Sequence, residues 1–161
     1  MSLNKNNYIS HNEIESCIKL LGYPYNKNNL IIQILNCTSD CLGEQYLNRI
    51  NIYPINFNTM NKDSVKAGII YILYHEMRHA YQSTYYEDRF IMSLNDNKKY
   101  LDKWIEKDAN QFAIRNCIRN NKEIEKILNI KYNYKLFWKQ FKKCKNSFMQ
   151  DGMSFYLKRG D

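Results

Sequence analysis

The chain contains 161 residues, of which 44% are hydrophobic and 14% aromatic, with only 2 prolines and 5 glycines. This composition excludes collagen-like, coiled-coil and low-complexity proteins, and the length predicts a single domain over residues 1–161. The formal net charge is +8, and residues 101–161 hold fourteen basic and seven acidic side chains, an excess of +7. The basic surface is therefore expected on the second half of the chain.

The absence of a membrane-spanning run and of a signal peptide predicts a cytoplasmic protein. The longest nearly apolar run, Ala67–Tyr74, is much shorter than the roughly 18–20 residues that span a bilayer. The N-terminal residues lack the apolar core of a signal peptide, so we expect an intracellular protein without membrane contact. In such a compartment the five cysteines are expected to be reduced thiols, most of them buried.

The first part of the chain predicts one helix followed by two strands. Ser10 begins a capping box with Glu13, and the apolar residues that follow share one helical face. The short apolar run Asn29–Leu35 and the alternating run Arg49–Phe57 are each typical of a strand. Pro54 has no N–H to donate to a ladder, so we expect the second strand at the edge of its sheet.

The remaining chain predicts helices. A cap at Asp63 or Ser64 begins a long helix that is apolar nearly all round, which is typical of a buried central helix. A less regular stretch, Ser83–Lys99, leads to a further helix, Tyr100–Arg119. Residues 120–161 predict one or two shorter helices of the same domain, with basic outer faces. The expected fold class is α+β, mostly helical, with a short antiparallel or mixed sheet packed on the central helix.

The central helix contains an HExxH motif, His75-Glu76-Met77-Arg78-His79. Residues four apart on an α-helix lie about 40° apart around the axis, so both imidazoles point into the same space and can bind one ion. A catalytic Zn²⁺ takes such nitrogen ligands, keeps one position for water and lowers the pKa of that water toward about 7. Glu76 is then expected to act as general base. Two ordinary core histidines are the alternative, but unpaired polar groups are costly on a buried helix.

The third ligand follows by elimination. A metzincin would need a histidine at the position of Tyr85, and the remaining histidine, His11, lies far upstream. A carboxylate is therefore expected to complete the set. Glu106 is the first candidate, because small residues one and two turns later allow its helix to approach another helix closely. Glu87 and Asp88 are weaker alternatives on the less regular stretch.

The segments HEMRHAYQ and WIEKDANQFA together resemble the HExxH helix and the glutamate helix of small gluzincin-type zinc metallopeptidases, particularly the ImmA/IrrE-like group. The resemblance spans about Val65–Ala113 and implies a small zincin-like domain. It also implies that Asn110 lies close to the ligands. Arg78 stands where the family usually has glycine, and we expect it to form a structural salt bridge. The site residues implied by the resemblance are the zinc ligands His75, His79 and Glu106 and the catalytic base Glu76.

The sequence thus predicts an intracellular zinc metalloendopeptidase that hydrolyses peptide bonds of a protein or peptide substrate. We expect the substrate to add as an extended strand to the sheet edge marked by Pro54. The donor that stabilises the oxyanion stays open among tyrosine, arginine and lysine side chains. The tyrosines considered are Tyr81, Tyr100, Tyr132, Tyr134 and Tyr156.

The alternative is a regulatory or anti-defence binding protein of a mobile element, with a structural zinc site and a basic partner-binding surface. The aromatic residues within Lys131–Lys145 have the spacing of a core-facing stripe beneath a solvated basic face. We therefore expect an acidic protein partner in preference to nucleic acid.

Overall fold

The computed structural model describes residues 8–25, 29–37, 39–54, 61–137 and 139. Most of these residues are helical and the sheet is small and mixed, which confirms the predicted α+β class. The elements, in chain order, are α1 (His11–Lys19), β1 (Ile31–Ile34), β2 (Gly43–Tyr46), β3 (Arg49–Ile52), α2 (Lys62–Tyr85), α3 (Glu87–Leu94), a 3₁₀ turn (Tyr100–Asp102), α4 (Trp104–Arg119) and α5 (Asn121–Leu128).

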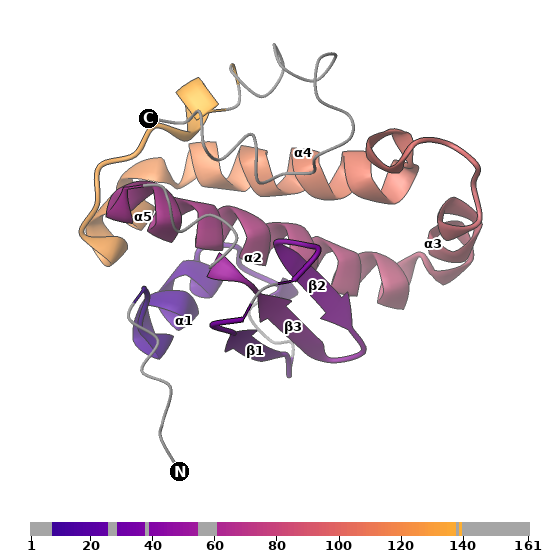
Figure 1. The fold of residues 1–161 in the computed structure, drawn as a ribbon, viewed down its shortest axis with the longest axis horizontal. Helices are drawn as coiled ribbons and strands as arrows, with labels where there is room; N and C mark the ends of the chain where they lie inside the picture. The colour runs from indigo at the N-terminus through magenta and orange to yellow at the C-terminus, as the bar shows by residue number, and fades with distance from the viewer. Residues whose placement is uncertain (1–7, 26–28, 38, 55–60, 138, 140–161) are drawn as a thin grey trace.

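Helix α2 is the centre of the fold. It packs against α4 on one side and against β2 and β3 on another, and Figure 1 shows α2 and α4 lying side by side in opposite directions. Helix α3 joins them at one end, while α1 and α5 pack together at the other end. Every residue from Ala67 to Tyr74 is buried, as expected for a helix that is apolar nearly all round.

The starts of the first two long helices follow the capping rules. The Ser10 hydroxyl accepts from the backbone N–H of Glu13 at 3.2 Å, and the Glu13 carboxylate accepts from the backbone N–H of Ser10 at 2.6 Å, which confirms the predicted capping box. Helix α2 begins slightly earlier than predicted, because Asn61 is its cap and accepts from the N–H of Ser64 at 2.9 Å.

The sheet has the strand order β1-β3-β2, with β1 parallel and β2 antiparallel to β3. The predicted edge position of β3 is therefore wrong. Pro54 lies beyond Ile52, the last residue of β3, so its missing N–H removes no bond from the ladder. The predicted continuation of this strand over residues 55–57 lies outside the described residues. Strand β2 was not predicted, because its sequence Gly-Glu-Gln-Tyr has no apolar alternation.

The stretch Ser83–Lys99 is more regular than predicted. Helix α2 continues to Tyr85, and α3 occupies Glu87–Leu94. The buried residue of α3 is Ser93, while Ile91, Met92 and Leu94 are exposed. The inward face of α3 thus consists of Ser93 and the partly buried Phe90, and this short, partly polar face explains why hydrophobic periodicity did not indicate this helix.

The second half of the chain is mostly helical where it is described. Helix α5 and the helical residues Tyr134–Phe137 agree with the predicted shorter helices, and the rest of that prediction, residues 140–161, lies outside the described residues. Cys17 and Cys117 are buried, as expected, whereas Cys37 is exposed. In the described part of the chain, no helix has the length and apolarity needed to cross a membrane.

Candidate metal centre

The site lies where α2 and α4 approach each other closely. Ala109 and Ala113 on α4 are fully buried, and their small side chains allow the two helix backbones to come together. The Tyr71 hydroxyl of α2 donates to Oδ1 of Asn110 at 2.8 Å across the same interface. Asn110, expected near the ligands, thus ties the two helices together, and Glu106 in the first turn of α4 faces α2.

The structure brings together the three predicted ligands. The Nε2 atoms of His75 and His79 lie 2.9 Å apart. The two carboxylate oxygens of Glu106 lie 3.3 Å from Nε2 of His75 and 3.4 Å from Nε2 of His79. The exposed fractions of the three residues are only 5%, 8% and 3% for His75, His79 and Glu106 respectively. These side chains form a buried group that could hold a metal ion.

The donor atoms fit a cation better than they fit one another. Oε2 of Glu106 is within ion-pair distance of His75, but it is buried and makes no hydrogen bond of acceptable geometry within the described residues. The Nε2 atoms of His75 and His79 also face each other. A single proton shared between these two nitrogens would leave the Glu106 carboxylate without a matching donor. A cation bound between the three side chains would engage all three donors at once. Such a set of two imidazoles and one carboxylate is found in catalytic zinc sites.

The electrostatics of the ligands favour positive charge at their centre. Burial raises the pKa of Glu106, but its close contacts with His75 and His79 and their positive charges outweigh burial and hold the pKa below its ordinary value. Burial lowers the pKa of His79, whereas its close contact with Glu106 and the charges of Glu76 and Glu106 raise it above the ordinary value. The surroundings of these three side chains thus favour a positive charge between them, which a bound metal ion would supply.

Glu76 lies beside the ligands and is 6% exposed. Burial raises the pKa of its carboxyl, and the negative charge of Glu106 adds to this, while the charges of His75 and His79 oppose it. Strand β2 passes directly over Glu76, because a Cβ atom added to Gly43 would lie 3.2 Å from Oε1 of Glu76. Glycine thus allows the strand to approach the expected base.

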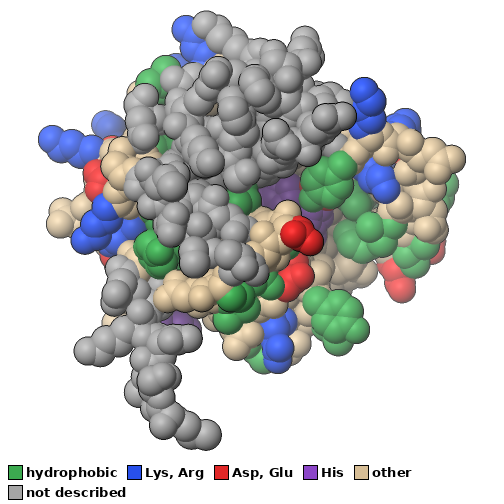
Figure 2. All heavy atoms as spheres, in the orientation of Figure 1, with side chains coloured by type: hydrophobic (Ala, Val, Ile, Leu, Met, Phe, Trp, Pro, Cys, Tyr) green, Lys and Arg blue, Asp and Glu red, His purple; other side chains and the backbone are tan. Residues whose placement is uncertain are grey.

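The weaker candidate ligands lie elsewhere. Glu87 and Asp88 are exposed in the first turn of α3. His11 pairs with Glu15 on α1 at 3.1 Å. Within the described ranges, the His75, His79 and Glu106 group is the single gathering of at least three potential ligand side chains. Figure 2 shows histidine side-chain atoms recessed between hydrophobic side chains, on the face that carries the sheet.

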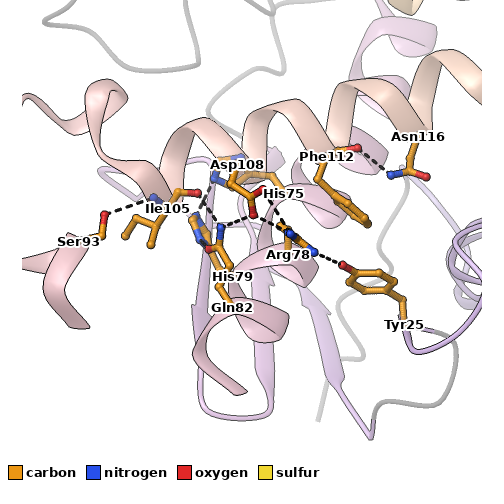
Figure 3. Close-up of polar contacts among 10 residues, drawn as sticks. All are labelled: Tyr25, His75, Arg78, His79, Gln82, Ser93, Ile105, Asp108, Phe112 and Asn116. Atoms are coloured by element: carbon orange, nitrogen blue, oxygen red, sulfur yellow. Dashed lines mark hydrogen bonds and ion pairs between the residues drawn. The ribbon is translucent and has the colours of Figure 1, made fainter. Parts of the chain in front are cut away.

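Two further polar residues of α2 form hydrogen bonds next to the site, and one of them, Gln82, contacts a candidate ligand directly. Arg78 donates from Nε to Asp108 at 2.6 Å, which confirms its predicted salt bridge, and from Nη1 to the Tyr25 hydroxyl at 2.7 Å. Oε1 of Gln82 lies 2.8 Å from Nδ1 of His79, the ring nitrogen that faces away from the ligand group (Figure 3). Sequence reasoning missed this role of Gln82. Its position three residues after His79 on the same helix was the available signal.

Among the tyrosines considered as oxyanion donors, Tyr100 has an electrostatic link to the site. Its pKa is raised by desolvation, by the charge and a hydrogen bond of Glu106, and by the charge of Glu76. The residue is 61% exposed, so its ring lies at the protein surface. Of the others, Tyr132 and Tyr134 are buried away from the ligands, and Tyr156 lies outside the described residues.

Comparisons with protein-family models, with curated proteins and with solved structures found no match. The function of this chain is therefore inferred from its candidate metal centre. The His75, His79 and Glu106 group agrees with the ligand set that the gluzincin resemblance implies.

Proposed function

We propose that this protein is a zinc-dependent metalloendopeptidase. The observation that carries the proposal is the convergence of His75, His79 and Glu106 in one buried group with Glu76 beside it. A structural zinc site is normally closed by four protein ligands, whereas three protein ligands are typical of a catalytic site with an open position. A buried carboxylate next to three ligands is the arrangement that water activation requires.

In this proposal, three side chains hold the metal ion and a fourth transfers protons. Nε2 of His75, Nε2 of His79 and the carboxylate of Glu106 would hold the zinc ion. The ion, when bound, lowers the pKa of a coordinated water and polarises a carbonyl group. The Glu76 carboxylate accepts the proton of the attacking water and returns it to the leaving amine.

Strand β2 is the element best suited to align a peptide, in place of the predicted edge at β3. One edge of β2 pairs with β3, and no other described strand pairs with its second edge. Because Gly43 of β2 lies over Glu76, a peptide that adds a strand there passes close to the base. Methylating the backbone amides on both sides of the cut should slow cleavage strongly. Equal cleavage of the methylated and unmethylated peptide would contradict this binding mode.

Tyr100 is the best candidate for the donor to the oxyanion. Its hydroxyl interacts with Glu106, and the charge of Glu76 also acts on it. Its partly exposed ring allows the side chain to turn toward a bound substrate. Once turned toward the substrate, its O–H would stabilise the negative charge that develops on the carbonyl oxygen.

The proposal is tested by metal analysis of the purified protein, followed by a comparison of newly formed protein N-termini. Wild type and Glu76→Gln would be added to the same protein extract, and the N-termini present only with wild type identify substrates. We expect about one zinc per chain in both proteins and cleavage only with wild type. A native protein that binds no zinc, or equal cleavage with both proteins, would reject the proposal.

A second candidate, a binding protein that recognises an acidic partner, is favoured by one surface feature. A groove of about 860 Å³ lies between the start of α5 and the segment that follows it. Arg119, Lys122, Lys131 and Lys135 line this groove with two acidic residues, Glu123 and Glu125. Reversing the charge of two of these lysines would abolish function in this case, while Glu76→Gln would have no effect.

A further inference from the structure

Gln82 is a fully buried polar residue next to the metal centre. It is 0% exposed, and its carboxamide takes part in three hydrogen bonds. Oε1 lies 2.8 Å from Nδ1 of His79. Nε2 donates to the backbone carbonyl of Ile105 at 3.0 Å and to Oδ2 of Asp108 at 2.8 Å. Figure 3 shows these contacts joining α2 to the first turns of α4.

The two acceptors determine which way the carboxamide points. A backbone carbonyl and a carboxylate oxygen both require a donor, so the NH₂ group must face Ile105 and Asp108. The opposite orientation would set the amide oxygen against two other oxygens. The carbonyl oxygen of Gln82 therefore faces His79, and Nδ1 of His79 must carry the hydrogen. The lone pair of the neutral ring is then on Nε2, the atom that faces His75 and Glu106.

Asp108 is itself held in position from its other side. Arg78 donates to both carboxylate oxygens of Asp108, at 2.6 Å and 3.3 Å. The guanidinium also lies over the rings of Tyr81 and Phe112, at 4.8 Å and 5.3 Å from their centroids. The arginine thus neutralises the charge of Asp108 and fixes its orientation. The chain of contacts runs from Arg78 through Asp108 and Gln82 to His79.

We infer that Gln82 is a positioning residue that holds His79 in the tautomer and orientation needed to bind the metal, and that Asp108 and Arg78 hold Gln82. Outer hydrogen-bond partners of this kind usually set the affinity of a metal site. Here the direct partner of the imidazole is a neutral amide, and the carboxylate lies one residue further out. The inference rests on the proposed metal site but not on peptide hydrolysis.

The first test replaces Gln82 with methionine, which has a similar length but cannot accept the hydrogen bond. The matched control is Gln111→Met, on the exposed face of α4. Zinc affinity would be measured by competition with a chromophoric chelator. We expect Gln82→Met to weaken zinc binding about 10–100-fold, and the control to leave it unchanged. Nitrogen-15 NMR should also show that the Nδ1 proton of His79, protected from exchange in wild type, exchanges rapidly in Gln82→Met.

The second test distinguishes positioning from a general loss of packing. In Gln82→Glu the introduced carboxylate still accepts from His79, but it faces Asp108 with no donor between them. The single variant Asp108→Asn removes the negative charge that pairs with Arg78 and replaces one of the two acceptor oxygens with an NH₂ group, so Gln82 is oriented less firmly. The double variant Gln82→Glu/Asp108→Asn restores one donor and one acceptor at this contact. We expect both single variants to weaken zinc binding, and the double variant to recover part of the loss seen in Gln82→Glu, because the carbonyl oxygen of Ile105 still lacks its donor. Gln111→Glu, alone and combined with Asp108→Asn, is the control pair.

The outcomes separate this inference from the proposed function. Zinc affinity and Nδ1 exchange that stay at wild-type values in Gln82→Met would overturn the inference. Effects of Gln82→Glu and Asp108→Asn that simply add would also overturn it. A wild-type protein that binds no zinc would instead reject the proposed function. In that event, protection of the His79 Nδ1 proton in wild type and its loss in Gln82→Met would still support the contact that fixes the tautomer of His79, but not a role of that contact in metal binding.

Discussion

Replacing Gly43 with alanine tests whether β2 is fitted against the expected base. A Cβ atom at this position would lie 2.4 Å from Cγ2 of Ile72 and 3.2 Å from Cγ of Glu76. Carbon atoms in contact normally lie about 3.5–4.0 Å apart, so β2 or Ile72 has to move by about 1 Å. Ile72 is 2% exposed and β-branched, and it has little room to move. We therefore expect β2 to shift away from α2.

The shift should affect catalysis more than folding. Overpacking of this kind costs about 1–3 kcal/mol in the free energy of unfolding. A displacement of about 1 Å at a reacting centre can lower a rate about 100-fold. We thus expect Gly43→Ala to remain folded, to bind zinc through His75, His79 and Glu106, and to cleave its substrate about 100-fold more slowly than wild type.

Urea unfolding, zinc content and the initial rate on a peptide whose cleavage requires Glu76 measure the three quantities. Gly22→Ala is a matched control, because φ of Gly22 is +70° and its added Cβ meets nothing within 4 Å. The left-handed backbone makes that change cost about 1–2 kcal/mol, and it should not alter the rate. Wild-type stability and rate in Gly43→Ala, or equal rate losses in both variants, would refute the reasoning.

Three further changes test other parts of the structure. Glu106→Gln should reduce zinc from about one per chain to a small fraction of that in metal analysis, and full zinc content would remove Glu106 from the ligand set. Tyr100→Phe should keep its zinc and lower kcat by about 100–1000-fold, whereas an unchanged kcat would exclude its hydroxyl as the oxyanion donor. Glu13 accepts from Lys66 at 2.8 Å; burial raises its pKa, but the Lys66 and Ser10 hydrogen bonds lower it below the ordinary 4.5. The ionised Glu13 therefore stabilises the fold above about pH 4.5, and this stabilisation is lost as the pH falls through the lowered pKa. The unfolding free energies of wild type and Glu13→Gln should converge in acid. A difference that stays constant with pH would contradict this.

The gathering of the three candidate ligands could be predicted because their geometry is mostly local. The spacing of His75 and His79 decides on its own that both imidazoles lie on one face of a helix. Predicting Glu106 also required knowing which helix lies against the HExxH helix. The small residues Ala109 and Ala113 indicated this, because they allow two helices to come close. The triad in the structure agrees with this prediction.

The missed elements have no such local signal. Strand β2 is held by pairing with β3 and by packing against α2, and helix α3 turns its polar Ser93 inward. Pro54 suggested an edge strand because a proline in a ladder would be costly, but the strand ends before it. The contact of Gln82 with His79 could be suspected from sequence, whereas its bond to Asp108 joins residues 26 positions apart.

The sequence by itself determined the fold class, the central buried helix and the candidate metal ligands, because helical periodicity and the HExxH spacing act over a few neighbouring residues. Only the tertiary structure decided which strand lies at the edge of the sheet, which glycine allows β2 to pack close to Glu76, and which side chains orient His79. Those features depend on contacts between segments far apart in the chain. Close packing of α2 against α4 and the sheet selects them, and no local pattern encodes them.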